Sequence, residues 1–332
     1  MSMKLPANAI LVLVLTTLLV ACSSVPPTAR TDDLCRFDPQ PPKPVPRVQI
    51  DDLGAIENTV ADLSQAHGAD KVLVVFDINN TLLTADRDFG SDAWFKWQDA
   101  IRTRPDCERV RVSKEFDGLL EVQYLAYSIG EMRPTQADTA ALIRRLADGE
   151  RGVMALTARG PEIRSSTVRE LGGNMIALRT APPCRAGSAD RPSLCARRGF
   201  ISAETILAVA EGTLSARERE TLGPDPRRIS YADGVMMVSG QNKGLMLRLL
   251  LASSPSLYEA IVFVDDGADN VIAVEEAFAG DATPTVKGFW YTAFEDANAR
   301  FWNDASRQEG TVRAWHTVSA ALCEAVGTYC EP

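Results

Sequence analysis

Four short polar segments of this chain contain the residue types that phosphoryl transfer requires. They are, in chain order, Asp77 with Asn79, then Thr157, then Lys243, and finally the pair Asp265-Asp266. A carboxylate can attack phosphorus, while a hydroxyl and an ammonium group can hold the phosphate oxygens. Additional carboxylates can bind the hard divalent cation that such reactions use. The residue types therefore point to phosphate-ester chemistry or phosphate-ester binding.

Each segment adjoins a predicted strand or helix of an α/β protein. The apolar runs at 72–76, 152–156 and 260–264 have no charged position, which is typical of parallel strands buried on both faces. Asp77, Thr157 and Asp265 directly follow these runs, and ligands of open parallel sheets bind at the carboxyl ends of the strands. The alternation of strands and helices predicts an α/β fold with a Rossmann-like, doubly wound parallel sheet.

The order of these segments resembles the haloacid dehalogenase-like superfamily over roughly residues 70–295. The run Asp77-Ile78-Asn79-Asn80-Thr81-Leu82 is similar to its first motif, Asp-x-Asp-x-Thr, which supplies a nucleophile, a general acid/base and a loop-bracing threonine. The resemblance implies an aspartyl-phosphate intermediate on Asp77 and a Mg²⁺ cofactor. The implied metal ligands are Asp77, the backbone carbonyl of Asn79, and Asp266 with its neighbour Asp265. The implied phosphate-binding residues are Asn80, Thr157, Ala158 and Lys243.

Asn79 departs from this motif because the second aspartate is replaced by an amide. An amide cannot donate and recover a proton at neutral pH, and general acid/base help is worth on the order of 10²–10⁴ in rate. Three interpretations remain open: a slow or restricted phosphatase, a degenerate protein that only binds magnesium and a phosphorylated ligand, or an enzyme with another acid/base residue. Candidates for that residue are Asp86, Asp88 and Glu115. By itself the sequence predicts that Asn79→Asp raises activity about tenfold or more.

Composition excludes several other functions. The chain has 332 residues, of which 45% are hydrophobic, and its formal charge of −9 argues against a nucleic-acid-binding surface. The expected partner is instead a small phosphorylated substrate or ligand. With only His67 and His316, a zinc site or a histidine-dependent hydrolase is not expected.

The N-terminus resembles a bacterial lipoprotein signal peptide over residues 1–21. Lys4 precedes an apolar run at 9–20, which is short for a membrane span, and small residues precede Cys22. The resemblance implies lipidation of Cys22 and an anchor in the outer membrane of a bacterial cell envelope. An uncleaved anchor helix and an ordinary secretory signal are the alternatives. The proline-rich residues 22–47 are expected to form a stalk that precedes a folded domain at 48–332.

Six cysteines remain besides Cys22, and an even number in an exported chain suggests disulfides. They are Cys35, Cys107, Cys184, Cys195, Cys323 and Cys330. Cys184 and Cys195 enclose one loop and Cys323 and Cys330 enclose the end of the chain, so local pairing is favoured in both. Cys35 with Cys107 follows only by elimination.

The aromatic-rich residues at about 88–131 form a predicted helical insertion between the first motif and the next helix of the domain. In the resembled superfamily this is the position of a cap over the active site, whereas packing as an extra layer of the core is the alternative. Outside the insertion, the periodicity predicts helices at 51–69, 133–147, 162–171, 245–251 and 271–279, strands at 175–178 and 286–291, a hairpin at 229–239 and a helical C-terminal segment.

Overall fold

The structure is a computed structural model that describes residues 35–37, 45–178, 192–194, 199–254 and 258–330. Within this part of the chain, seven strands form one sheet in the order β1-β9-β8-β2-β5-β7-β6, and only β6 runs antiparallel to its neighbour. The strands are β1 Gln49–Ile50, β2 Val72–Phe76, β5 Gly152–Thr157, β6 Ser230–Ala232, β7 Val235–Met237, β8 Ala260–Asp265 and β9 Thr285–Tyr291. The fold is therefore α/β and Rossmann-like, as the sequence predicted.

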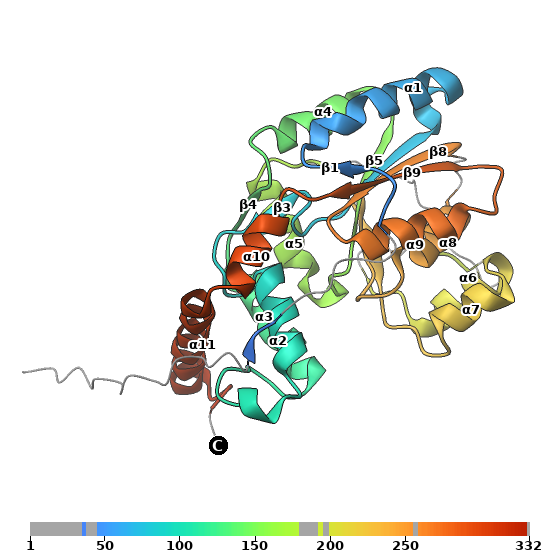
Figure 1. Ribbon diagram of the computed structural model, residues 1–332. Coiled ribbons are helices and arrows are strands. Elements are labelled where there is room, and N and C mark those ends of the chain that lie inside the picture. Colours follow the sequence, from blue (N-terminus) through green and yellow to red (C-terminus); the bar gives the residue numbers. More distant parts are fainter. Residues whose placement is uncertain (1–34, 38–44, 179–191, 195–198, 255–257, 331–332) are drawn as a thin grey trace, which may run out of the picture.

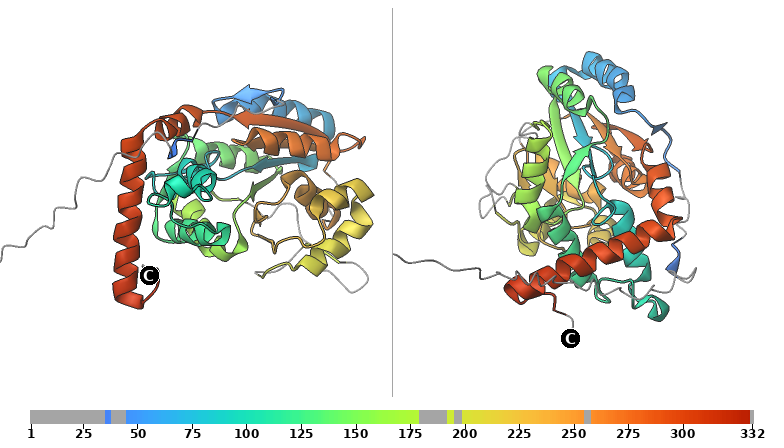
Figure 2. Two further views of the ribbon diagram at one scale, coloured as in Figure 1. Left: turned by 60° about the horizontal axis from the view of Figure 1, so that its bottom comes forward. Right: turned by 90° about the vertical axis from the view of Figure 1, so that its left-hand side faces the viewer.

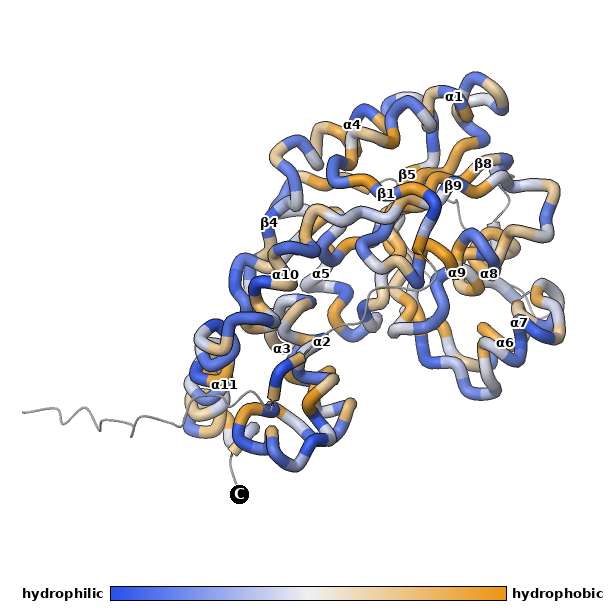
Figure 3. The backbone as a smooth tube through the Cα atoms, viewed as in Figure 1, coloured by the Kyte–Doolittle hydropathy of each residue, from blue (hydrophilic) through white to orange (hydrophobic). Residues whose placement is uncertain are grey.

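Helices cover both faces of this sheet (Figure 1). Helices α1 (Glu57–His67) and α4 (Thr139–Asp148) lie on one face, and α6 (Ala203–Thr213), α8 (Lys243–Ala252) and α9 (Ala268–Phe278) lie on the other. Two hydrophobic cores lie on the two faces of the sheet, one under α1 and α4 and the other under α6, α8 and α9. Along β2, Val72, Val74 and Phe76 belong to the first core, whereas Leu73 and Val75 belong to the second. This alternation explains the uninterrupted apolar runs, which appear as a hydrophobic layer between the helices (Figure 3).

Three parallel strands, β8, β2 and β5, lie side by side at the centre of the sheet. The chain passes from β2 to β5 on one side and later returns to β8 on the other side of β2. The carboxyl ends of these strands therefore border the point at which the strand order reverses, where sheets of this kind bind their ligands.

The predicted insertion leaves the domain through a two-stranded antiparallel ribbon of β3 (Leu83–Ala85) and β4 (Met132–Pro134). Between these strands lie α2 (Asp92–Ile101) and α3 (Phe116–Ile129). The two helices form a third hydrophobic core with Trp94, Trp97 and Leu119, to which the C-terminal helices α10 (Glu295–Trp302) and α11 (Ala305–Val326) contribute Phe301 and Trp315. Figure 2 shows α11 as a long helix beside the insertion, at the end of the molecule away from α6 and α7 (Ala216–Leu222).

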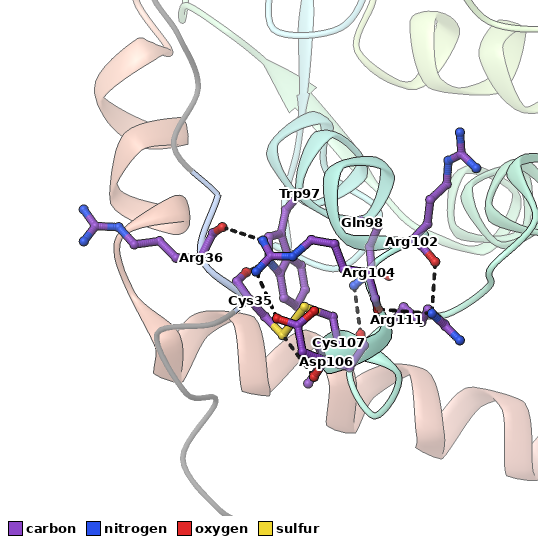
Figure 4. Close-up of a disulfide and its surroundings, with 10 residues drawn as sticks. Cys35, Arg36, Trp97, Gln98, Arg102, Arg104, Asp106, Cys107 and Arg111 are labelled. Carbon is purple, nitrogen blue, oxygen red and sulfur yellow. Dashed lines mark hydrogen bonds and ion pairs between the residues drawn. A yellow bond between two sulfur atoms is a disulfide. The ribbon is translucent and has the colours of Figure 1, made fainter.

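A disulfide joins the N-terminal segment to this insertion (Figure 4). Cys35 is bonded to Cys107, and the backbone carbonyl of Cys35 accepts a hydrogen bond from Trp97 Nε1 at 2.9 Å. Cys323 is bonded to Cys330 near the end of the chain. The structure thus confirms these two pairings, whereas Cys184, Cys195 and Cys22 lie outside the described residues.

Two sequence predictions about secondary structure were wrong. The expected helix at 133–147 begins only at Thr139, because Met132–Pro134 pairs with Leu83–Ala85 and the Thr135 backbone N–H donates to the Leu82 carbonyl. The expected strand at 175–178 does not form. Met175 adopts a left-handed conformation with φ of 57°, and Ile176 N–H donates to the Leu171 carbonyl, so this segment terminates α5 (Arg164–Gly173).

The remaining elements agree with the expected ones in type. The hairpin turns at Asp233-Gly234 between β6 and β7, and helices at 57–67, 164–173, 243–252 and 268–278 stand where helices were predicted. The sequence did not predict α6 or α7 (Ala216–Leu222). No helix among the described residues is both long enough and apolar enough to cross a membrane.

Candidate active site

Three carboxylates meet at the carboxyl ends of β2 and β8. Asp77 is the first residue after β2, Asp265 is the last residue of β8, and Asp266 follows it. One carboxylate oxygen from each lies within 4.8 Å of one from each of the others. The parallel pairing of β2 with β8 produces this cluster, because it sets Phe76 opposite Val264 and so brings both strand ends to one level.

Lys243 is the cation at the centre of this cluster. It is the first residue of α8, where Asn242 caps the helix, and its side chain is 2% exposed. Its Nζ donates to Asp77 Oδ1 at 2.5 Å and to Asp265 Oδ2 at 2.7 Å. Burial disfavours the charged form of Lys243, but Asp265 and Asp77 outweigh that effect, so its pKa is raised and the side chain is ionised.

Asp77 is electrostatically perturbed. Burial raises the pKa of its carboxyl to about 7, and the neighbouring charge of Asp265 also raises it, whereas Lys243 lowers it. The Asp77 pKa therefore lies close to neutrality despite the nearby ammonium group.

Asp265 and Asp266 have different surroundings. Asp265 Oδ1 accepts from the Gly267 N–H at 2.8 Å and from Asn270 Nδ2 at 2.9 Å, and Oδ2 accepts from Lys243, so both oxygens are engaged. The Asp266 side chain lines the cavity in front of the sheet. Burial raises the pKa of Asp266 well above its usual value, and Lys96 of α2 offsets only part of this rise.

The cavity has a volume of about 850 Å³ and lies between the strand ends, α2, α3 and α10. Asp77, Asn79, Thr157, Ala158, Lys243 and Asp266 all line it, so six of the eight residues that the sequence assigned to the site face a common space. Asp265 and Asn80 are not in its lining. Asn80 Oδ1 accepts from Thr84 Oγ1 at 3.0 Å and its backbone N–H donates to Leu83, which fixes it within the loop.

The side chain of Asn79 is bound on both of its polar atoms. Arg159 Nε donates to Asn79 Oδ1 at 2.8 Å, and Asn79 Nδ2 donates to the Tyr127 hydroxyl at 2.5 Å. Arg159 also forms a buried ion pair with Glu170 at 2.6 Å, and its guanidinium carbon lies 4.1 Å from the centre of the Tyr127 ring. The first-motif loop, the insertion and the segment after β5 are thus joined by one hydrogen-bonded network.

The structure adds three residues to the site that sequence reasoning missed. Arg159 and Tyr127 belong to the network around Asn79, and Lys96 faces the cavity with its ammonium 2.8 Å from Asp92. The position of Arg159, two residues after Thr157, was a usable signal. Tyr127 and Lys96 had none, because only the packing of the insertion determines which of its polar side chains face the sheet.

The three acid/base candidates of the sequence lie away from the cavity. Asp88 forms an ion pair with Arg307, Asp86 forms one with Arg133 at 3.4 Å, and Glu115 precedes the first residue of α3. Among the described residues that line the cavity, none of these three is present.

Comparison with known proteins places these features in a family. No curated protein matches the chain. The profile of a family described as "Protein of unknown function (DUF2608)" matches residues 49–320, which span the sheet, the cluster of carboxylates, the insertion and most of α11. The chain therefore belongs to this DUF2608 family of proteins of unknown function.

Proposed function

We propose that the protein is a magnesium-dependent phosphohydrolase of the haloacid dehalogenase-like type, with the insertion at about 88–131 as a helical cap. The observation that carries the proposal is the common cavity of Asp77, Asp266, Lys243 and Thr157. A nucleophilic carboxylate, a cation, a hydroxyl and a second carboxylate are the groups that phosphoryl transfer through an aspartyl phosphate requires.

Magnesium fits the residues present. Three carboxylates lie within 4.8 Å of one another; Lys243 neutralises one of their three negative charges when all are ionised, and the nearby Lys96 is already paired with Asp92. Like charges in a buried cluster are stable only with a cation or with shifted pKa values, and oxygen ligands suit Mg²⁺. Asp77 and Asp266 are the side chains that would hold the ion from the cavity side, with Asp265 behind them. When bound, the ion would neutralise phosphate charge and orient the ester.

In the proposed reaction each of these side chains has a defined role. An Asp77 oxygen attacks phosphorus, the bond from phosphorus to the ester oxygen breaks, and the electron pair leaves with that oxygen. Lys243 and the hydroxyl of Thr157, a buried residue, hold the phosphate oxygens. Water then attacks the aspartyl phosphate, which releases phosphate and restores Asp77.

A second candidate function is supported by the network around Asn79. Because Arg159 and Tyr127 bind both polar atoms of that amide, position 79 offers no proton to a substrate. A protein that binds magnesium and a phosphorylated ligand without turning it over is therefore the alternative.

A phosphate-ester panel on the purified protein tests the proposal. Hydrolysis should require magnesium and should vanish in Asp77→Asn, because the amide cannot attack phosphorus. If no ester is hydrolysed while magnesium and an ester still bind, the protein is the binding protein of the alternative.

The proposed localisation rests on the lipoprotein-like signal at residues 1–21, which lies outside the described residues. Cys22 would carry the lipid and anchor the domain in the bacterial cell envelope, at the outer membrane. Cys22→Ser should release the protein from the membrane fraction, and an unchanged fractionation without acyl chains on Cys22 would contradict the anchor.

A further inference from the structure

The orientation of the Asn79 amide is determined by Arg159. A guanidinium group has only donors, so the Asn79 atom 2.8 Å from Arg159 Nε must be the carbonyl oxygen Oδ1. The other atom, Nδ2, therefore points at the Tyr127 hydroxyl oxygen, 2.5 Å away. Since Nδ2 can only donate, the Tyr127 oxygen is the acceptor in this bond.

This polarity leaves the hydroxyl hydrogen of Tyr127 available to another acceptor. A phenol accepts through its oxygen and donates through its own O–H, and no acceptor for that hydrogen is found among the residues that the structure describes. Tyr127 lies on α3 with 8% of its surface exposed and lines the same cavity as Asp77 and Lys243. The hydroxyl can therefore donate to an oxygen of a ligand that binds in this cavity.

Burial raises the pKa of the Tyr127 hydroxyl to about 12, although the charge of Arg159 and the Asn79 amide lower it, so the hydroxyl keeps its hydrogen for donation. The Arg159 guanidinium lies over the ring at 4.1 Å, and the Asn79 amide donates to the hydroxyl. Glu170 holds Arg159 through a buried ion pair, so the cation keeps its position. The donor is thus oriented before any ligand arrives, which is what electrostatic stabilisation of a developing charge requires.

We propose that Tyr127 donates the hydrogen bond that stabilises the leaving-group oxygen of the phosphate ester, in place of the acid/base residue that Asn79 cannot be. The inference rests on the proposed function. When the bond from Asp77 to phosphorus forms and the ester bond breaks, the negative charge on the departing oxygen is stabilised by the Tyr127 O–H. The alkoxide then takes its proton from water, which becomes hydroxide.

Lys96 is another polar side chain that the insertion presents to the cavity, as are Gln123 and Tyr124 of α3. Its ammonium is bound to Asp92 at 2.8 Å and is attracted by Asp266, so it faces the carboxylate cluster. Tyr127, by contrast, contacts the side chain of position 79 directly. We assign the leaving-group role to Tyr127 because it contacts Asn79, the residue at the acid/base position of the motif.

Tyr127→Phe tests the assignment because it removes one oxygen and keeps the ring over which Arg159 lies. With magnesium present, kcat for an alkyl ester such as β-glycerophosphate should fall about 10²-fold, the effect of losing one oriented donor. Hydrolysis of p-nitrophenyl phosphate, whose leaving group needs little stabilisation, should change only a few-fold. Across substituted phenyl phosphates, log(kcat/KM) should depend more steeply on leaving-group pKa in the variant.

Tyr329→Phe is the matched control, because Tyr329 packs against Trp315 away from the cavity and should leave both activities unchanged. An equal loss on both esters, or no loss on either, in a Tyr127→Phe protein with normal melting temperature would refute the role of Tyr127 and leave the phosphohydrolase intact. If the natural protein hydrolyses neither ester, the proposed function fails and the role of Tyr127 fails with it.

Discussion

The effect of a carboxylate at position 79 depends on Arg159, which is bound to the Asn79 side chain. Arg159 Nε faces the Asn79 oxygen at 2.8 Å, so a carboxylate at position 79 would form an ion pair with a guanidinium group. Such a pair favours the ionised carboxylate, which cannot act as an acid. The structure therefore gives a physical reason not to expect the gain in activity that the motif alone suggests.

Asn79→Asp should leave the hydrolysis of alkyl phosphates within a few-fold of the natural protein. The measurement is kcat/KM for the same alkyl and aryl esters in both proteins. Asn79→Ala is the comparison, because it removes both the amide oxygen bound by Arg159 and the donor to Tyr127. A gain of about tenfold or more in Asn79→Asp would mean that the new carboxyl carries a proton despite Arg159.

Asp77 links the stability of the protein to pH and magnesium. Its folded-state pKa is raised to about 7 by burial, above the ordinary value of 3.8, so the folded protein binds this proton more tightly than the unfolded chain. Stability contributed by this group should therefore fall as pH rises from about 4 to about 7, and stay level above that. The proposed magnesium ion would compete with this proton and should restore stability at pH 8 more than at pH 5.

Thermal unfolding with magnesium and with a chelator at several pH values measures this linkage. Asp77→Asn provides the reference, because its side chain does not titrate and the difference between the two proteins isolates the group. A magnesium-induced rise in melting temperature that is the same at pH 5 and pH 8 would contradict the coupling.

Lys243 is positioned by the start of helix α8. Gly244 permits this position, because a Cβ added there would lie 2.1 Å from the backbone carbonyl oxygen of Ala273 in α9. A backbone atom cannot move aside as the end of a flexible side chain can, so the helices would have to separate. The close packing of α8 against α9 therefore positions the Lys243 ammonium between Asp77 and Asp265.

Gly244→Ala should destabilise the protein by about 2 kcal/mol, the scale of overpacking. Gly212 in α6 is the matched control, because nothing lies within 4 Å of a Cβ added there. Gly212→Ala should be neutral or stabilising by up to about 1 kcal/mol, since alanine favours a helix. Chemical denaturation of both variants gives the comparison, and equal effects would exclude the proposed steric cause.

The sequence predicted the elements whose signal is local. The buried strands at 72–76, 152–157 and 260–265 and the hairpin at Asp233-Gly234 follow from apolar runs and turn residues, and with them the placement of Asp77, Thr157 and Asp265. The pairing of Arg133 with Thr84 could not be predicted, since an arginine before a proline also suits the start of a helix. Likewise, only tertiary packing turns Tyr127 toward Asn79.

The insertion is held in place by parts of the chain that lie far apart in sequence. Phe37 stacks edge-on against Trp302 of α10, Trp97 contacts Phe301, and Cys35 is bonded to Cys107 across 72 residues. The third core is therefore built from the N-terminal segment, the insertion and the C-terminal helices. The insertion is thus attached both through its β3–β4 ribbon and through these contacts with the two ends of the chain. We therefore expect it to form a rigid wall of the cavity.

Removal of the Cys35–Cys107 bond by Cys35→Ser with Cys107→Ser should therefore destabilise the protein by about 4 kcal/mol in a chain-entropy account, because the bond closes a long loop. The bond between Cys323 and Cys330, which are separated by seven residues, is the control and should contribute only about 2 kcal/mol. Denaturant unfolding measures both, and limited proteolysis should find new cleavage between 86 and 131 only in the first variant. If the two losses are equal and the insertion stays resistant, the aromatic contacts of Trp97 and Trp302 hold the insertion without help from the disulfide.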